Sequence, residues 1–301
     1  MLLPVTAGFA VAATLLFVLA GDTGLLAAVA GSQVLLLGAI AAVARRQEAA
    51  EKDADRRLRG QVEAVRLSVN KRGFENRRRL DELREELDGV RAEASRRFAQ
   101  TDYLIGLYYD LRPKSALPAT GGWAASADLL RCLYDTVRDE GRSRIVECGS
   151  GVSTLVMAYA LRELGGGKIT SLDHDADFAA QTRRMLEQHE LQQWAEVRHA
   201  PLTKLELDDE IWLWYELAEV PDGPFDMLVI DGPPRATRDQ ARYPALPLLY
   251  DRLGDDAVVV LDDHIRPDER AAAARWIETY PTLKQQVFKQ HDKETLILRK
   301  A

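Results

Sequence analysis

Two long uncharged stretches at the start of the chain place the strongest constraint on its fold. No charged side chain occurs in residues 2–20 or 25–44. At a rise of about 1.5 Å per residue, a helix of either length can cross a hydrocarbon core of about 30 Å. Gly21-Asp22-Thr23-Gly24 separates the two stretches and has the composition of a turn. The pattern predicts a two-helix transmembrane hairpin.

The charges that flank these stretches predict an orientation in the membrane. Arg45 and Arg46 directly follow the second stretch, whereas the separating turn contains no basic residue. The positive-inside rule therefore predicts a two-pass membrane protein whose remaining chain lies in the cytoplasm. A signal peptide is the alternative interpretation. It requires a basic start, and Met1-Leu2-Leu3-Pro4 has none.

A charged, helix-favouring segment follows from residue 45 to about residue 100. Its apolar residues recur at alternating steps of three and four, as expected for a heptad seam: Leu58, Val62, Val65, Val69, Leu80, Leu83, Leu87, Val90 and Ala94. Gly73 and Asn76 interrupt the pattern. One interpretation is a parallel coiled coil that joins two copies as a homodimer. The other is a lone amphipathic helix that lies on the domain or on the membrane surface.

The rest of the chain alternates apolar strand-like runs with helical patterns. Strands are predicted at residues 144–148, 168–173, 195–199, 225–231, 257–262, 284–289 and 295–299, and helices at 153–164, 176–189, 237–253 and 270–280. This alternation predicts an α/β fold with a doubly wound, mainly parallel seven-stranded sheet. The two consecutive strands at the end predict one antiparallel edge strand, and residues 208–215 an inserted hairpin. The expected domains are residues 1–44 (membrane anchor), 45–100 (helical spacer) and 101–301 (sheet domain).

Charge and cysteine content exclude some classes of partner and site. The chain has a formal net charge of −7, and the excess of acidic residues lies after the spacer. An acidic sheet domain argues against a nucleic-acid partner, because phosphate binding requires a basic face. Cys132 and Cys148 are isolated and form no zinc motif, so we interpret them as buried, reduced thiols. Arg235, Arg238 and Arg242 are interpreted as a solvated helix face, with an anionic acceptor as the alternative partner.

Two strand ends carry the residues that point to a ligand. The first predicted strand ends in Glu147-Cys148-Gly149-Ser150-Gly151, where two glycines let the backbone approach a ligand closely. Thr154 stands where a dinucleotide fingerprint requires a third small residue, so that motif is incomplete. The second strand ends in Ser171-Leu172-Asp173-His174. An acid at this position can accept both ribose hydroxyls of an adenosyl ligand.

With these motifs, the strand Phe225–Gly232 and the late strand pair, residues 121–299 resemble class I S-adenosylmethionine-dependent methyltransferases. The resemblance implies S-adenosylmethionine as the cofactor. It further implies that Glu147 faces the methionine end of the cofactor and that Asp173 holds the ribose. The remaining cofactor-binding residues implied by the resemblance are Gly149, Ser150 and Gly151 in the loop and His174 beside the adenine.

Acidic residues follow the next two predicted strands of the sheet. Asp231 ends one strand and Asp262-Asp263-His264 ends the next, so their carboxylates are expected to lie together as oxygen ligands for Mg²⁺. The layout resembles catechol-type O-methyltransferases, in which two acids and an amide hold the metal; here Asp263 stands in place of the amide. Pro234 occupies the position of that family's lysine base, so His264 is the alternative base. The competing interpretation is that these aspartates cap a helix and that Asp231 touches only the cofactor.

The combined expectation is a membrane-anchored enzyme that transfers a methyl group to a small hydroxylated acceptor. The acceptor would be a glycolipid, a saccharide or a metabolite, with Asp231 and His264 as catalytic residues. Two alternatives remain from the sequence. One is a membrane-tethered coiled-coil scaffold with a non-catalytic domain, and the other is a nicotinamide-dependent oxidoreductase. Methylation of nitrogen rather than oxygen is also compatible with the residues.

Overall fold

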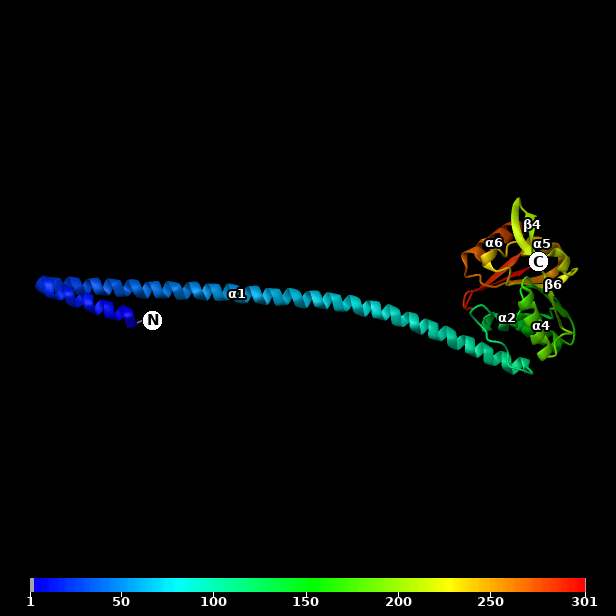
Figure 1. Cartoon of the computed structure of the whole chain (residues 1–301), viewed down its shortest axis with the longest axis horizontal. Coiled ribbons are helices and arrows are strands. Elements are labelled where there is room, and N and C mark those ends of the chain that lie inside the picture. The colour runs from blue at the N-terminus through cyan, green and yellow to red at the C-terminus, as the bar shows by residue number, and fades with distance from the viewer. Residues whose placement is uncertain (1–2, 301) are drawn as a thin grey trace. The chain divides into compact units, whose positions relative to one another are not determined.

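The computed structural model describes the backbone of residues 3–300. The chain forms two compact units, Met1–Asp88 and Gly89–Ala301 (Figure 1). The unit boundary lies inside one long helix. The expected domain boundaries at residues 44 and 100 were based on membrane contact and function. The boundary between the two compact units does not test them, so they stay predictions.

Helix α1 runs without interruption from Leu3 to Leu111. The ribbon turns back on itself near its N-terminal end in Figure 1, but every residue of this range is assigned to the helix. The prediction of two helices joined by a non-helical turn at residues 21–24 is therefore wrong. A helical glycine costs only about 1 kcal/mol relative to alanine, and proline, the strongest helix breaker, is absent between Pro4 and Pro113.

The spacer part of α1 is stabilised along its own surface. Glycine and asparagine at positions 73 and 76 do not break the helix. Ion pairs at a spacing of four residues line it, as between Lys52 and Glu48 (2.6 Å) and between Arg78 and Glu82 (3.0 Å). Each such pair stabilises a helix by about 0.3–0.5 kcal/mol. The apolar seam predicted from the heptads is exposed, with Leu83 at 52%. Local interactions therefore hold this segment, and its apolar seam has no partner among the described residues.

The second unit is built on a seven-stranded sheet in the order β3-β2-β1-β6-β7-β9-β8. Its strands are β1 Arg144–Cys148, β2 Lys168–Asp173, β3 Ala195–His199, β6 Phe225–Ile230, β7 Leu253–Leu261, β8 Lys284–Phe288 and β9 Thr295–Arg299. The first five pair in parallel, whereas β9 is antiparallel to both β7 and β8. The antiparallel strand was expected at the edge, but it lies one place inside, because the short β8–β9 connection folds β9 back between β8 and β7.

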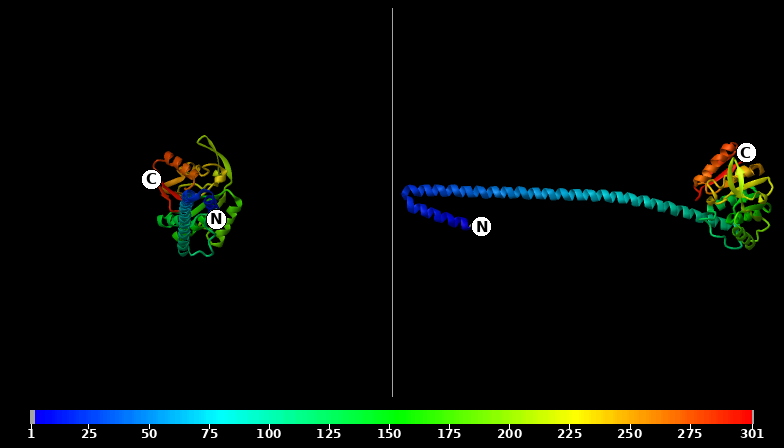
Figure 2. Two further views of the ribbon diagram at one scale, coloured as in Figure 1. Left: turned by 90° about the vertical axis from the view of Figure 1, so that its left-hand side faces the viewer. Right: turned by 45° about the horizontal axis from the view of Figure 1, so that its top comes forward.

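Helices cover both faces of this sheet (Figure 2). The helices after the first are α2 Ala127–Glu140, α3 Val152–Leu164, α4 Ala176–Gln188, α5 Ala245–Leu249 and α6 Pro267–Thr279. Successive residues of β1 enter different cores: Ile145 packs with residues of α2, α3 and α4, whereas Val146 packs with residues of α5 and α6. This alternation is the two-residue period of a strand buried on both sides. It leaves the strand ends as the open edge at which a ligand can bind.

Two segments differ from the sequence predictions. The helix expected at residues 237–253 is mostly irregular, with only the single turns η2 Arg235–Thr237 and η3 Tyr250–Arg252 beside α5. Pro244 and Pro247 explain the difference, since proline lacks the N–H that a helix interior requires. The inserted hairpin is present but longer than expected.

The hairpin consists of β4 Leu202–Leu207 and β5 Glu210–Tyr215, and the single turn η1 Leu217–Glu219 follows it. Asp208 and Asp209 connect the strands with positive φ angles of 55° and 61°. Aspartate tolerates this left-handed region, which suits a two-residue hairpin turn.

Candidate active site

The glycine loop after β1 lies at the carboxyl edge of the sheet, between the ends of β2 and β6. Gly149 has a φ of 115° and its N–H donates to the carbonyl of Leu172 at 2.8 Å. A Cβ atom at Gly149 would lie 3.7 Å from the Cβ of Asp231. Gly151 has a φ of 152°, which an L side chain rarely adopts. The loop therefore follows a path that requires glycine and that contacts the end of β6 directly.

Glu147 is enclosed behind this loop. Its carboxylate accepts hydrogen bonds from the hydroxyls of Ser153 (2.5 Å), Thr154 (2.6 Å) and Ser171 (2.6 Å), and it has no solvent exposure. Burial raises the pKa of Glu147 to about 7, although these hydroxyls oppose the shift. The residue thereby ties the loop to α3 and β2, and its expected contact with the methionine end of a cofactor stays a prediction.

Asp173 connects the end of β2 to the glycine loop. Its Oδ2 accepts a hydrogen bond from the Ser150 hydroxyl at 2.5 Å, and its Oδ1 accepts one from the N–H of Asp175 at 3.0 Å. The Ser150 hydroxyl also lies 3.0 Å from the Thr182 hydroxyl. His174 Nδ1 is 3.7 Å from Asp173 Oδ1. The structure thus brings four of the predicted cofactor residues, Ser150, Asp173, His174 and the flanking Gly149, to one edge.

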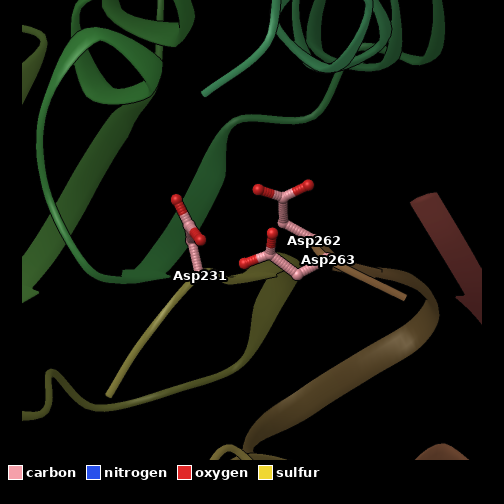
Figure 3. A group of neighbouring side chains, drawn as sticks. All are labelled: Asp231, Asp262 and Asp263. Carbon is pink, nitrogen blue, oxygen red and sulfur yellow. The ribbon is translucent and has the colours of Figure 1, made fainter. Parts of the chain in front are cut away.

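Three carboxylates gather at the ends of β6 and β7. Asp231, Asp262 and Asp263 each offer one oxygen, and these oxygens lie within 4.8 Å of one another (Figure 3). We refer to these three residues as the acidic cluster. Parallel pairing continues into the cluster, since the N–H of Asp262 donates to the carbonyl of Ile230 at 3.1 Å. The predicted meeting of these acids is thus observed.

Arg242 occupies the interior of the acidic cluster, where sequence reasoning did not place it. Its Nη2 lies 3.0 Å from Asp231 Oδ1 and 2.8 Å from Asp263 Oδ2, and its Nη1 donates to the carbonyl of Asp262 at 2.9 Å. The residue is 4% exposed, so its interpretation as part of a solvated helix face is wrong. The expected helix does not form around it, and the irregular chain before α5 turns its side chain inward.

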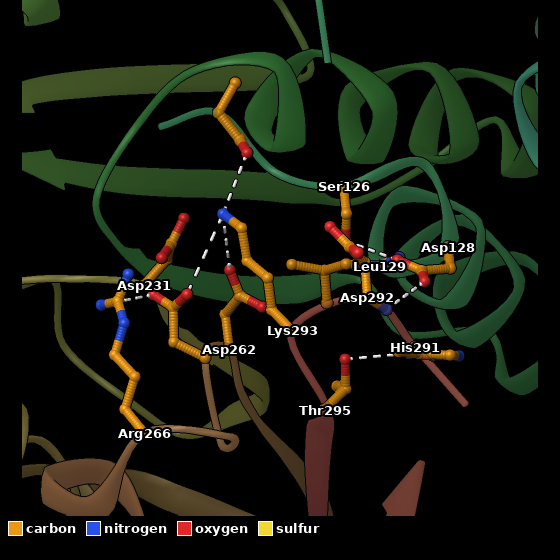
Figure 4. A network of polar contacts seen from close by, with 12 residues as sticks. Ser126, Asp128, Leu129, Asp231, Asp262, Arg266, His291, Asp292, Lys293 and Thr295 are labelled. Carbon is orange, nitrogen blue, oxygen red and sulfur yellow. Dashed lines mark hydrogen bonds and ion pairs between the residues drawn. The ribbon is translucent and has the colours of Figure 1, made fainter. Parts of the chain in front are cut away.

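Asp262 differs from its two neighbours in the cluster. It is 1% exposed, and neither of its carboxylate oxygens has a hydrogen-bond partner among the described residues. Burial, and then the charges of Asp231 and Asp263, raise its pKa to about 8. Lys293 Nζ lies 4.0 Å from Asp262 Oδ2 and 3.9 Å from Asp263 Oδ1, so an ammonium group faces the carboxylate that Arg242 does not bind (Figure 4).

The acidic cluster does not fit a magnesium ion bound by all three acids. Mg²⁺ requires near-octahedral oxygen ligands at about 2.0–2.1 Å. The Arg242 guanidinium already lies within hydrogen-bond distance of Asp231 and Asp263, and Arg266 Nη1 is a further 2.8 Å from Asp263 Oδ2. A metal that bridged these oxygens would displace a buried arginine from its partners. Binding of Mg²⁺ therefore stays a prediction, and the arginines that contact Asp231 and Asp263 argue against it.

His264 follows the cluster, and its side chain is 14% exposed. Its Nδ1 has no hydrogen-bond partner among the described residues and lies 3.6 Å from Glu294 Oε2. Burial lowers the pKa of His264, although Glu294 opposes that shift. This shift favours the neutral imidazole, and the role of His264 as a base stays a prediction.

One family model and several solved structures are similar to parts of this chain. Residues 146–264 match the family model described as a methyltransferase domain. Similar solved structures include the SAH-bound methyltransferase PaMTH1 of Podospora anserina, with 16% identity over 66% of this chain and 88% of that chain and a TM-score of 0.48. An O-methyltransferase of Bacillus cereus in complex with SAH has 21% identity over 67% and 90% of the two chains and a TM-score of 0.44. A comparison with curated protein sequences finds no match.

The matched segment begins in β1, includes the glycine loop and the acid after β2, and ends at His264. It thus contains every residue predicted to bind the cofactor or to act in catalysis. Its strands have the parallel order that places those residues at one edge. The sheet domain is an S-adenosylmethionine-dependent methyltransferase with a Rossmann-like fold.

Proposed function

We propose that this protein is a membrane-anchored O-methyltransferase that acts on a small hydroxylated acceptor. The main support for this proposal is the contact between the glycine loop and Asp231. Gly149 lies against Asp231, so the loop that would hold the cofactor adjoins the strand end that would meet the acceptor. A methyl donor and a hydroxyl bound on the two sides of this contact are close enough to react.

The cofactor side of the site comprises the glycine loop and the acid after β2. We propose that the carboxylate of Asp173 accepts the ribose hydroxyls and that His174 lies beside the adenine. Gly149, Ser150 and Gly151 would contact the remainder of the cofactor, with Glu147 near its methionine end. The Ser150 hydroxyl supports this assignment, because it orients the Asp173 carboxylate at 2.5 Å.

The acceptor side would use Asp231 and His264. The Asp231 side chain is 25% exposed, so an acceptor hydroxyl can reach its carboxylate. His264 would remove the hydroxyl proton while the acceptor oxygen attacks the sulfonium methyl in line. The carbon–sulfur bond breaks as the carbon–oxygen bond forms, leaving a neutral thioether and a protonated histidine. The protein contributes mainly proximity and orientation.

The first unit would supply the anchor and the spacing. The part of α1 from Ala27 to Leu111 contains a stretch long and apolar enough to cross a membrane, and only 6% of that stretch is buried. Exposed side chains such as Leu35 (61%) and Ile40 (57%) would be covered by lipid. We propose that residues 1–44 anchor the chain, that residues 45–100 form a cytoplasmic spacer which dimerises as a coiled coil, and that residues 101–301 carry out catalysis.

The proposal is tested on the full chain in detergent micelles. Calorimetric titration should show binding of S-adenosylmethionine and none of NAD. The same protein is then incubated with methyl-deuterated S-adenosylmethionine and a lipid and metabolite extract, and labelled products are identified by mass spectrometry. His264→Gln should bind the cofactor normally and yield no labelled ether. Label on nitrogen alone, or no label with a cofactor-binding protein, would refute O-methylation.

A further inference from the structure

We infer that the acidic cluster is a metal-independent centre whose positive charge is supplied by the chain itself, by Arg242 on one side and Lys293 on the other. The inference rests on the proposed function for the reaction that this centre serves. The inference itself concerns only the cluster: Arg242 and Lys293 occupy the place of a divalent cation beside Asp231, Asp262 and Asp263. Figure 3 shows the three carboxylates, and Figure 4 shows Lys293 beside Asp262.

Arg242 is held firmly against the acidic cluster by several hydrogen bonds. Its two terminal nitrogens reach the side chains of Asp231 and Asp263 and the backbone carbonyls of Asp231 and Asp262, all at 2.8–3.0 Å. Bonds between charged groups of this kind are about twice as strong as neutral ones, and removing one partner leaves a buried charge uncompensated. A divalent cation would therefore have to break several strong contacts in order to bind the same carboxylates.

Lys293 is held in place from three directions. Its carbonyl accepts the N–H of Ile265 at 3.0 Å, and its Nζ donates to the carbonyl of Ala124 at 3.1 Å. The N–H of the preceding residue, Asp292, donates to Asp128 at 2.6 Å. The β8–β9 connection is thus tied to the loops before α2 and after β7, and the lysine side chain is only 16% exposed. Unlike an ordinary surface lysine, this side chain is directed at the acids by its surroundings (Figure 4).

The three carboxylates of the cluster are matched in number by nearby cations of the chain. Three carboxylates face three cations, since Arg266 also lies 2.8 Å from Asp263. A fourth acid, Glu269, lies 3.8 Å from Arg242 and 3.7 Å from Arg266, so the one acid in excess lies beside the two arginines and outside the cluster. In a buried site an added double charge is costly unless it meets an uncompensated negative charge. The unpartnered oxygens of Asp262 face the Lys293 ammonium, so they do not constitute such a charge.

The experiment measures Mn²⁺ binding by the full chain in detergent micelles, from the electron paramagnetic resonance signal of free Mn²⁺. The wild-type protein should show no saturable binding. Lys293→Met and Arg242→Met each remove one internal cation and should each create a saturable Mn²⁺ site, which a second change, Asp262→Asn, removes again. Lys289→Met is the matched control, because Lys289 lies exposed on the same β8–β9 connection. It should bind no more Mn²⁺ than the wild type.

Two outcomes would overturn the inference. One is saturable Mn²⁺ binding by the wild type that Asp262→Asn abolishes. The other is failure of Lys293→Met to gain a site, which would show that the internal cations do not exclude the metal. If Arg242→Met does not fold, the Mn²⁺ binding of Lys293→Met alone tests the inference. Calorimetry with S-adenosylmethionine on the same preparations tests the proposed function separately, because loss of cofactor binding leaves the Mn²⁺ result unchanged.

Discussion

The two units of this chain place their apolar side chains in different surroundings. In the sheet unit, residues such as Leu155, Val258 and Leu296 are fully buried by other parts of the same unit. In the helical unit, Leu35 and Leu58 remain 61% and 59% exposed. Burial of an aliphatic side chain stabilises a fold by about 1.5–3 kcal/mol. The sheet unit therefore has its own core, whereas the helical unit is held by local ion pairs and leaves these apolar side chains exposed.

The largest effect is expected at the proposed membrane anchor, where lipid would cover the exposed apolar side chains. Leu36→Arg combined with Ile40→Arg should remove the chain from membranes, because an arginine at the centre of a span costs about 3 kcal/mol each time. The fraction of protein in the membrane pellet after an alkaline wash measures the effect. Gln61→Arg combined with Gly60→Arg adds the same charge to the spacer and should leave the fraction unchanged. Retention of the first variant in the pellet would contradict the anchor.

Within the sheet unit, the buried carboxylate of Glu147 is expected to destabilise the fold when it is ionised. The pKa of Glu147 in the folded protein is about 7, above its ordinary value of 4.5. The folded state therefore binds more protons than the unfolded state between these values, so stability falls as the pH rises from about 4.5 to about 7. Below 4.5 the contribution is constant, and across the window it amounts to at most about 3 kcal/mol.

Glu147→Gln should reduce the slope of this part of the pH profile, and Asp262, whose pKa burial raises to about 8, should account for slope that remains. Urea unfolding of the full chain between pH 4.5 and 8, followed by fluorescence of the sheet unit, gives the measurement. Glu163→Gln changes an exposed acid in the last turn of α3, which accepts a single hydroxyl, that of Tyr134, and should retain the wild-type slope. An unchanged slope in Glu147→Gln would show that Glu147 does not titrate in this window.

The next effect concerns binding at the strand edge. Asp173→Ala should lower the affinity for S-adenosylmethionine about hundredfold, or about 2.7 kcal/mol, because the ribose hydroxyls and Ser150 would lose a charged acceptor. Calorimetry on the full chain measures the change. Asp177→Ala removes an exposed acid from the nearby first turn of α4 and should bind like the wild type. Unchanged affinity in Asp173→Ala would remove the ribose assignment.

Much of the sheet was predictable from the sequence, because short apolar runs end in clear turn signals. The predicted bounds of β1, β2, β3 and β9 match those of the structure. The acidic cluster was predictable for a related reason, since acids that follow adjacent parallel strands must meet at one edge. In these segments the local sequence pattern predicts the strands, and the order of the strands predicts which of their ends meet.

The cations of the cluster were not predicted, for two different reasons. Arg242 lay within an apparent helical pattern, although Pro244 and Pro247 were available as a signal against that helix. Lys293 had no local signal at all. Its position depends on how the β8–β9 connection meets Asp128 and Ala124, which are far away in the sequence. Helix α2 was also missed, and Asp128 in its first turn binds the β8–β9 connection.

The smallest effect is expected at the apolar seam of the spacer. If a second copy of the chain is its partner, Leu83 and Leu87 would lose an exposure of about half their surface on dimerisation, worth about 1 kcal/mol each. Leu83→Lys combined with Leu87→Lys should then shift the full chain from dimer to monomer in sedimentation equilibrium. Glu85→Lys changes the charge on the opposite face of the helix and should leave the dimer intact. A wild-type chain that is already monomeric would instead favour a helix lying along the membrane surface, so the same experiment decides which outside surface completes this unit.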